Sequence, residues 1–276
     1  MLKRAIFGAI YVAIILAGIL CGNLTLLLLL LLLSTLGVNE FLVMTSPKEE
    51  VTPNEAAIAL LQRSLDCVGA AVLVIAMWSG QMFYPALVTF MLYLVIRLCL
   101  QLWTPSQNAV ESLSHSFMAM LYIAFPISLM TWIYSFSPHL LLLLFVLVWI
   151  NDTFAYLTGR FLGRHKLWER ISPKKTWEGF WGGLFFTVAT GVGCAMLWPD
   201  YFLHLSPMGL GFLAALTSIA GTLGDLVESL LKRTEHVKDS GTLIPGHGGI
   251  LDRIDSILLV IPTATIFLYF ALFYAV

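Results

Sequence analysis

The chain has 276 residues, of which 59% are hydrophobic and only 11% are charged, and its formal net charge is −1. About a quarter of the residues of a soluble domain are charged, so this composition excludes a soluble protein and predicts an all-α, polytopic integral membrane protein. The net charge itself carries little information, because the positions of the charges matter more, and no nucleic-acid partner is expected.

Nine apolar runs come close to the length of about 20 residues that a helix needs to cross a bilayer. They lie near residues 5–21, 24–44, 65–80, 83–102, 117–135, 139–158, 180–198, 208–230 and 255–275. The first is expected to be a retained span, because no small-residue cleavage site with a soluble domain follows it. The stretch at 65–103 is divided into two spans, because Ser79-Gly80-Gln81 and Pro85 interrupt it. The sequence therefore predicts about nine transmembrane helices.

Basic residues orient these spans, because Lys and Arg concentrate in cytoplasmic loops. If Lys3 and Arg4 are inside, all 15 Lys and Arg residues lie on or near the cytoplasmic side and the C-terminus is external. We expect this arrangement in a bacterial plasma (inner) membrane. In the first inner loop, turns over 46–55 are expected to precede a short amphipathic helix over 56–61 on the membrane surface. The turns that face the cytoplasm are 45–64, 103–116, 159–179 and 231–254.

The chain divides into two regions. Residues 1–135 form an N-terminal set of spans one to five. Residues 136–276 form the expected catalytic region, which holds spans six to nine and the polar cytoplasmic loops 159–179 and 231–254. The four cysteines lie in or beside apolar runs without metal-ligand spacing, so we expect reduced packing residues and no disulfides.

Span six ends in Asn151 and Asp152, which we expect inside the helix below the membrane surface. An acid in that position is costly and indicates a functional role by default. The alternative is that Asp152 pairs with Arg160 or Lys174 and only holds two helices together.

The next polar group precedes span seven. The pair Ser172-Pro173 is typical of a helix start, where hydroxyl groups and free backbone N–H groups face one spot. With Lys174, Lys175 and Thr176 nearby, such a spot suits a phosphate group. An ordinary capped span flanked by lysines would explain the same residues.

The stretch from Asp225 to Asp255 is the most polar part of the chain. Asp225 and Glu228 are three residues apart at the end of one helix, and Asp252 and Asp255 are three apart at the start of the next. Carboxylates that meet at two consecutive helix ends repel one another unless a cation lies between them. Oxygen ligands of this kind suit Mg²⁺, which takes substrate phosphate oxygens in its remaining positions. A nucleotide triphosphate is the expected partner.

The loop between these helices combines basic residues with glycines. Gly248 and Gly249, in a Pro-Gly-His-Gly-Gly run, let the backbone approach a ligand and turn amides toward anions. For His247 a hydrogen bond within the loop is as good an explanation as catalysis. Basic residues at a helix end also extend to the membrane surface without binding anything. The bases that would offset phosphate charge are Lys232, Arg233, Lys238 and Arg253.

The pattern from Ser229 to Asp255 resembles the hallmark pattern of phosphatidate cytidylyltransferases, also called CDP-diacylglycerol synthases. It reads Ser-x-Leu-Lys-Arg, four more residues, then Lys-Asp-x-Gly-x-x-Ile-Pro-x-His-Gly-Gly-Ile-x-Asp-Arg-Ile-Asp. The segments at 151–160, 172–179 and 224–229 are similar to further motifs of the family. Glu40 with Phe41 resembles an acid–aromatic pair near the end of the family's second span. A helix-end acid at the interface explains Glu40 nearly as well, so it is left out of the predicted site.

The resemblance implies that CTP and phosphatidate react to CDP-diacylglycerol and pyrophosphate, with Mg²⁺ and a monovalent cation such as K⁺. The lipid phosphate is already an oxyanion, so the reaction needs charge neutralisation and in-line placement rather than a protein nucleophile. The predicted metal ligands are Asp225, Asp252 and Asp255. Phosphate binding is assigned to Lys174, Lys175, Lys232, Arg233 and Lys238, with Lys232 and Arg233 counted as catalytic. The remaining substrate-binding residues are Asn151, Asp152, Ser172, Thr176, Asp239, His247, Gly248, Gly249 and Arg253.

Three other functions fit parts of the sequence. A polyprenol or phytol kinase would also use CTP, but it would pass on the γ-phosphate and release CDP. A transporter could use Asp152 and Asp225 as ion or proton sites, although the two halves show no convincing repeat. A structural scaffold would give no reason for carboxylates, glycines and bases to lie together.

A homodimer that packs through exposed spans is compatible with the sequence.

Overall fold

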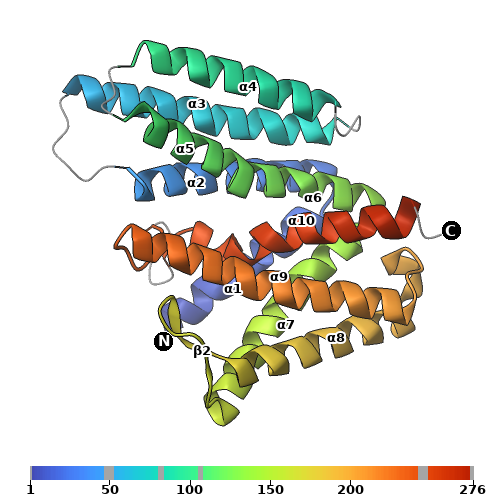
Figure 1. Ribbon diagram of the computed structural model, residues 1–276. Helices are drawn as coiled ribbons and strands as arrows, with labels where there is room; N and C mark the ends of the chain where they lie inside the picture. The colour runs from blue at the N-terminus through green and yellow to red at the C-terminus, as the bar shows by residue number, and fades with distance from the viewer. Residues whose placement is uncertain (1, 47–52, 80–83, 105–107, 242–247, 274–276) are drawn as a thin grey trace. The chain divides into compact units, whose positions relative to one another are not determined.

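The computed structural model describes residues 2–46, 53–79, 84–104, 108–241 and 248–273. Over these ranges the regular secondary structure is helical apart from one short hairpin (Figure 1). Eight of the described helices are long and apolar enough to cross a membrane, and a shorter apolar helix covers Ile6–Leu20. This confirms the predicted all-α polytopic membrane protein. The count of nine spans, which depends on the shorter helix, stays a prediction.

The long helices coincide with the predicted apolar runs, although α3 and α5 begin well before them. Those of the N-terminal half are α1 (Leu2–Leu20), α2 (Asn23–Met44), α3 (Pro53–Trp78), α4 (Tyr84–Leu102), α5 (Ala109–Ala119), the π-helical turn η1 (Met120–Ala124) and α6 (Phe125–Phe136). Those of the C-terminal half are α7 (Pro138–Leu162), β1 (Lys166–Trp168), β2 (Ser172–Thr176), α8 (Trp177–Leu197), the 3-10 turn η2 (Pro199–Phe202), α9 (Pro207–Thr234) and α10 (Leu251–Phe273).

Two compact units divide the chain. The first unit comprises residues 1–132 together with 239–252, and the second comprises 133–238 together with 253–276. The described residues of this segment, 239–241 and 248–252, therefore pack with the N-terminal helices, although they lie far from them in the sequence.

A buried polar network joins α3, α4 and α5 in the first unit. The carboxylate of Asp66 accepts hydrogen bonds from the Tyr93 hydroxyl at 2.8 Å and the Ser116 hydroxyl at 2.7 Å. Arg97 lies 3.6 Å from the same carboxylate, and its Nε donates to Ser116 at 3.0 Å. Because charged groups are stable in an apolar setting only when they are paired and hydrogen-bonded, the network fixes these three helices to one another.

The N-terminal end of α3 differs from the prediction. Of the residues 46–55 that were predicted to form turns, 47–52 lie outside the described residues. From Pro53 the helix continues without a break to Trp78, so the predicted turn over 53–55 and the separate short helix over 56–61 do not form. Proline is well suited to a first helical position because its φ angle is already helical, and Glu55 in the first turn interacts favourably with the helix dipole.

In the second unit α7 packs on α8, and α8 packs on α9. Glycines make these contacts close. A Cβ atom at Gly179 would lie 2.7 Å from the carbonyl oxygen of Ala155 on α7, and one at Gly191 would lie 2.6 Å from the Cβ of Ala214 on α9. Small residues of this kind let helix backbones approach in a membrane, where the hydrophobic effect does not drive helices together.

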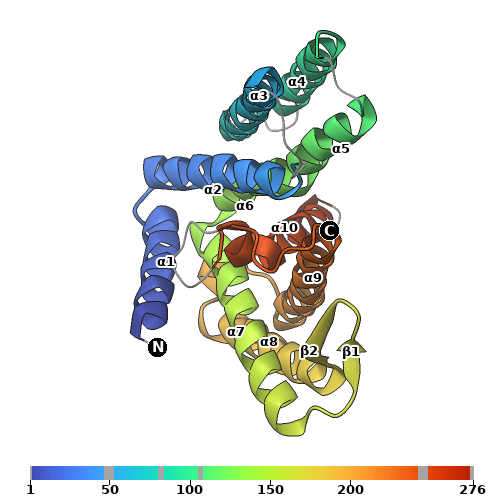
Figure 2. The same cartoon turned by 90° about the vertical axis from the view of Figure 1, so that its left-hand side faces the viewer.

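The predicted helix start at Ser172 is wrong. Residues Ser172–Thr176 form β2, which pairs antiparallel with β1, and Figure 2 shows this hairpin next to α8. The helix begins only at Trp177, because Thr176 supplies the N-cap: its hydroxyl accepts the Gly179 N–H at 3.1 Å. The strand pairing holds Ser172 and Pro173 in extended backbone, so the Ser172 hydroxyl and the backbone N–H groups that follow Pro173 do not form the anion-binding helix terminus that the sequence suggested.

Candidate active site

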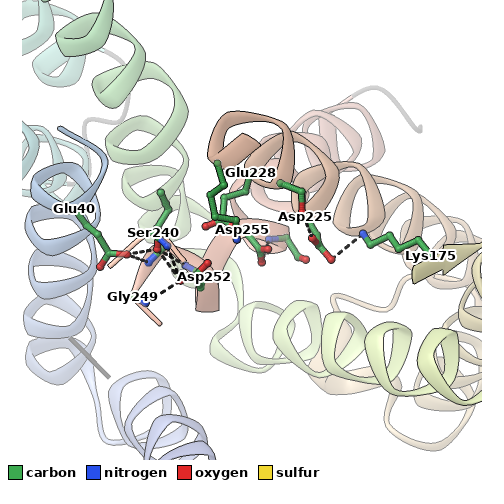
Figure 3. Close-up of polar contacts among 12 residues, drawn as sticks. Glu40, Lys175, Asp225, Glu228, Ser240, Gly249, Asp252 and Asp255 are labelled. Carbon is green, nitrogen blue, oxygen red and sulfur yellow. Dashed lines mark hydrogen bonds and ion pairs between the residues drawn. The ribbon is translucent and has the colours of Figure 1, made fainter. Parts of the chain in front are cut away.

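In the second unit, α9 and α10 touch at Gly224. A Cβ atom on this glycine would lie 2.7 Å from the Asp255 carbonyl oxygen and 3.0 Å from the Ser256 Cα. The absence of a side chain thus allows the backbone of α10 to lie directly against α9. The contact brings Asp225 and Asp255 next to each other, as the sequence predicted for the acidic helix ends (Figure 3).

Lys175 reaches this point from strand β2. Its ammonium group is 2.8 Å from Oδ2 of Asp225 and donates to the Thr222 carbonyl oxygen at 3.2 Å. The other oxygen of Asp225 accepts the Ser229 hydroxyl at 3.1 Å. The hairpin, rather than a helix terminus, therefore delivers a positive charge to Asp225. Phosphate binding by Lys175 stays a prediction.

Asn151 and Asp152, at the end of α7, have different surroundings. Asn151 is buried: its Oδ1 accepts the Ser218 hydroxyl at 2.6 Å, and its Nδ2 lies 3.4 Å from Thr222 Oγ1. Asp152 is exposed and lies within electrostatic range of Asp225 and Lys175. Asn151 thus links α7 to α9, whereas Asp152 adds a third carboxylate near Asp225 and Asp255.

The structure gives no support to the purely structural role considered for Asp152. Among the described residues no ion pair joins it to Arg160 or Lys174. Arg160 instead donates to the Tyr156 hydroxyl at 3.0 Å, and Lys174 is exposed. We call Asp152, Lys175, Asp225, Glu228 and Asp255 the Asp225 cluster.

The basic residues at and after the end of α9 differ in their contacts with the carboxylates. Lys232 lies 2.7 Å from the buried Glu228, one turn earlier on the same helix, and Glu228 is also in hydrogen-bonding contact with Asp255. The side chains of Arg233 and Lys238 are exposed, as is that of Asp239. Lys232 is thus connected to the carboxylates of the Asp225 cluster, and no described contact connects Arg233 or Lys238 to them.

A second group of polar residues lies in the first unit. Oδ2 of Asp252 accepts hydrogen bonds from the Ser240 and Gly249 N–H groups, and the Ser240 hydroxyl also lies within hydrogen-bonding distance of it, each at 2.9 Å (Figure 3). Gly248 has a φ of 80°, and a Cβ atom there would overlap the same oxygen. The Gly249 amide therefore does point toward an anion, and in the structure that anion is the Asp252 carboxylate.

Glu40 of α2 completes this group, although it was left out of the predicted site. Its carboxylate accepts the Ser240 hydroxyl and the Ile250 and Leu251 N–H groups. The sequence did contain one signal, the resemblance of Glu40 and Phe41 to the acid–aromatic pair of the family's second span. We call Glu40, Ser240, Gly249 and Asp252 the Glu40 cluster.

The remaining predicted substrate-binding residues are Arg253, Ser172, Thr176 and His247. Arg253 lies between Asp252 and Ile254 in the first turn of α10 and is half-buried. Ser172 is half-buried in β2, and Thr176 serves as the cap of α8. His247 lies outside the described residues.

The donor set can be compared with the needs of Mg²⁺. Among the residues that the structure describes, no three His, Cys, Asp or Glu side chains converge as a ready-made metal site. Mg²⁺ does not require one, since it is usually bound through one or two carboxylates plus water and substrate phosphates. Asp225 and Asp255 provide oxygen donors of this kind from neighbouring helices, so the chemistry of the residues fits the ion.

Residues 2–271 match the model of the Cytidylyltransferase family. The phosphatidate cytidylyltransferase of Staphylococcus aureus (strain COL) is 51% identical over 133 residues, which cover 47% of this chain and 49% of that protein. The proteins of the same name from Staphylococcus haemolyticus and Staphylococcus saprophyticus are 48% and 47% identical over 130 residues, with the same coverage. The chain spans about half the length of the curated relatives that it matches.

Proposed function

Because the chain belongs to the cytidylyltransferase family, we propose that it transfers a cytidylyl group from CTP to phosphatidate, giving CDP-diacylglycerol and pyrophosphate. The observation that carries the proposal is the contact of α9 and α10 at Gly224, which holds Asp225 beside Asp255, with Lys175 paired to Asp225. The names of the relatives support the choice of substrates.

The reaction joins two anions. A phosphate oxygen of phosphatidate forms a bond to the α-phosphorus of CTP, and the bond from that phosphorus to the oxygen bridging to the β-phosphate breaks. The attacking oxygen already carries negative charge, so no side chain has to remove a proton from it. The protein has to hold the two anions in line and reduce their repulsion.

We assign metal binding to Asp225 and Asp255, with Asp252, one helical turn before Asp255 on α10, as the third proposed ligand. Mg²⁺, when bound, supplies positive charge to the phosphate oxygens. K⁺ as a second cation is proposed on the family resemblance alone. Basic residues proposed to bind phosphate are Lys174, Lys175, Lys232, Arg233 and Lys238.

The long apolar helices make the chain an integral membrane protein. We propose that it lies in a bacterial plasma membrane with the N-terminus and the active site cytoplasmic and the C-terminus external. The concentration of Lys and Arg in the expected inner loops supports this orientation. Soluble CTP and a lipid headgroup could then both reach the carboxylates.

Product analysis with labelled CTP tests the proposed reaction. Purified protein is incubated with phosphatidate, Mg²⁺ and CTP labelled at either the α- or the γ-phosphorus, and the lipids are separated. We expect the α-label in the lipid and the γ-label in pyrophosphate. Transfer of the γ-label to lipid with release of CDP would instead establish a kinase, and solute flux in sealed vesicles without CTP would favour a transporter.

Replacing Lys175 with alanine should raise the KM for CTP by about tenfold and lower kcat less, because one cation near the substrate phosphates is lost. The variant also leaves Asp225 without its ion pair, so its thermal stability should fall in EDTA and recover with Mg²⁺. Arg170→Ala is the matched control, since Arg170 is an exposed base of the same hairpin. An unchanged KM for CTP in Lys175→Ala would remove this residue from the phosphate-binding set.

A further inference from the structure

Glu40 is a carboxylate near the end of an apolar helix, and its side chain is only 8% exposed. An acid in such a place is unfavourable unless its oxygens are hydrogen-bonded. Oε2 accepts the Ile250 N–H at 2.8 Å, and Oε1 accepts the Leu251 N–H at 3.3 Å and the Ser240 hydroxyl. All three donors come from the segment 239–252, which is about 200 residues away in the sequence and belongs to the same compact unit.

Two of these donors lie at the N-terminus of α10. Leu251 is the first residue of the helix and Ile250 precedes it, so their N–H groups are among those that have no partner within the helix. A negative charge at this end also interacts favourably with the helix dipole. Glu40 thus performs from α2 the task that an N-cap residue performs within a helix.

Glycines around Glu40 make room for its carboxylate. A Cβ atom at Gly249 would overlap Glu40 Cδ, and one at Gly241 would lie 2.8 Å from the same atom. Any other residue at Gly249 would therefore collide with the carboxylate. Part of the glycine-rich pattern is explained by this contact with Glu40, independently of any ligand.

Ser240 connects Glu40 to Asp252. Its hydroxyl oxygen lies within hydrogen-bonding distance of both carboxylates, and its N–H donates to Asp252. A change at Glu40 therefore reaches Asp252 through one intervening side chain.

We propose that Glu40 is a positioning residue: it fixes Ser240 and the first turn of α10, and thereby sets the orientation of the Asp252 carboxylate. The catalytic consequence rests on the proposed function, in which Asp252 binds Mg²⁺. Residues that orient metal ligands typically change metal affinity or activity about 10- to 100-fold when they are replaced.

Glu40→Gln tests the proposal, because it keeps the size of the side chain and removes its charge. The control is Glu111→Gln, which removes the charge of an acid in the first turn of α5, in the same unit and away from the Glu40 cluster. In Glu40→Gln the Mg²⁺ concentration for half-maximal turnover should rise about tenfold, with a smaller change in the KM for CTP. Glu111→Gln should behave as the unmodified protein.

Hydrogen–deuterium exchange provides a readout that does not depend on activity. The Ile250 and Leu251 amides should exchange about tenfold faster in Glu40→Gln than in the unmodified protein or in Glu111→Gln. If the unmodified protein fails to convert CTP and phosphatidate while this acceleration is seen, the proposed function is wrong and the positioning contact stands.

Ser240→Ala serves as a second variant in case Glu40→Gln folds poorly. It removes the hydroxyl that connects the Glu40 and Asp252 carboxylates. The double variant Glu40→Gln/Ser240→Ala should therefore need no more Mg²⁺ for half-maximal turnover than the more affected single variant. The proposal is overturned if both single variants keep the normal Mg²⁺ requirement and normal amide exchange, or if activity falls only in proportion to the folded fraction.

Discussion

Replacing Asp255 with asparagine is expected to lower the turnover of CTP and phosphatidate by on the order of 10³-fold while the protein remains folded. The asparagine cannot supply the negative charge that a metal ligand needs. Asp255 lies near the carboxylates of Asp225 and Asp152, so removing one of three like charges should leave thermal stability unchanged or raise it. Loss of activity without loss of stability is therefore the expected result.

Turnover and melting temperature in detergent, each measured over a range of Mg²⁺ concentrations, check this prediction. Asp200→Asn is the matched control, since Asp200 is an exposed acid on η2, outside both clusters. Near-normal turnover in Asp255→Asn would remove the metal assignment. If the melting temperature of Asp255→Asn falls so far that the loss of folded protein accounts for the loss of turnover, Asp255 is a structural residue.

Gly224→Ala should destabilise the protein by about 1–3 kcal/mol and abolish most of its activity, because the added methyl group meets backbone atoms that have no rotamer to change. Its Cβ would lie 2.7 Å from the Asp255 carbonyl oxygen and 3.0 Å from the Ser256 Cα. The helices α9 and α10 have to separate to admit it, and Asp225 moves away from Asp255.

Gly193→Ala is the control for this substitution. Gly193 lies on α8, and a methyl group added there would meet no described neighbouring atom within 4 Å. Replacing a helical glycine with alanine normally stabilises a helix by about 0.5–1 kcal/mol. Melting temperatures of the two variants should therefore move in opposite directions. If Gly224→Ala melts and turns over normally, the close contact of α9 and α10 at this residue is not required.

The helices could be predicted from the sequence because each apolar run is long and bounded by polar residues. The start of α3 and the hairpin could not. At Pro53 the same residues are compatible with a turn or with a helix start, and local preference does not choose between them. At Ser172 the choice depends on strand pairing with Lys166–Trp168 and on the cap at Thr176, which are contacts between separate segments.

The Asp225 cluster was also only partly predictable, because some of its contacts follow from local spacing and others join separate segments. Spacing along α9 and α10 places acids at two neighbouring helix ends, so the meeting of Asp225 and Asp255 follows from local pattern. The ion pair of Lys175 with Asp225 depends on the hairpin and could not be foreseen. Glu40 was left out because a helix-end acid at the interface explains it nearly as well as the family resemblance does, and a single acid in an apolar helix does not identify a partner 200 residues later.

The hydroxyl group of Ser240 has one hydrogen atom, and both Glu40 and Asp252 lie within its reach. At any instant it can satisfy only one of these two acceptors, and the other must rely on backbone amides. A cation that attracts the oxygens of Asp252 would release this hydrogen to Glu40. Metal binding would then strengthen the hydrogen bond between Glu40 on α2 and Ser240. Metal occupancy and the order of the first turn of α10 would therefore rise together.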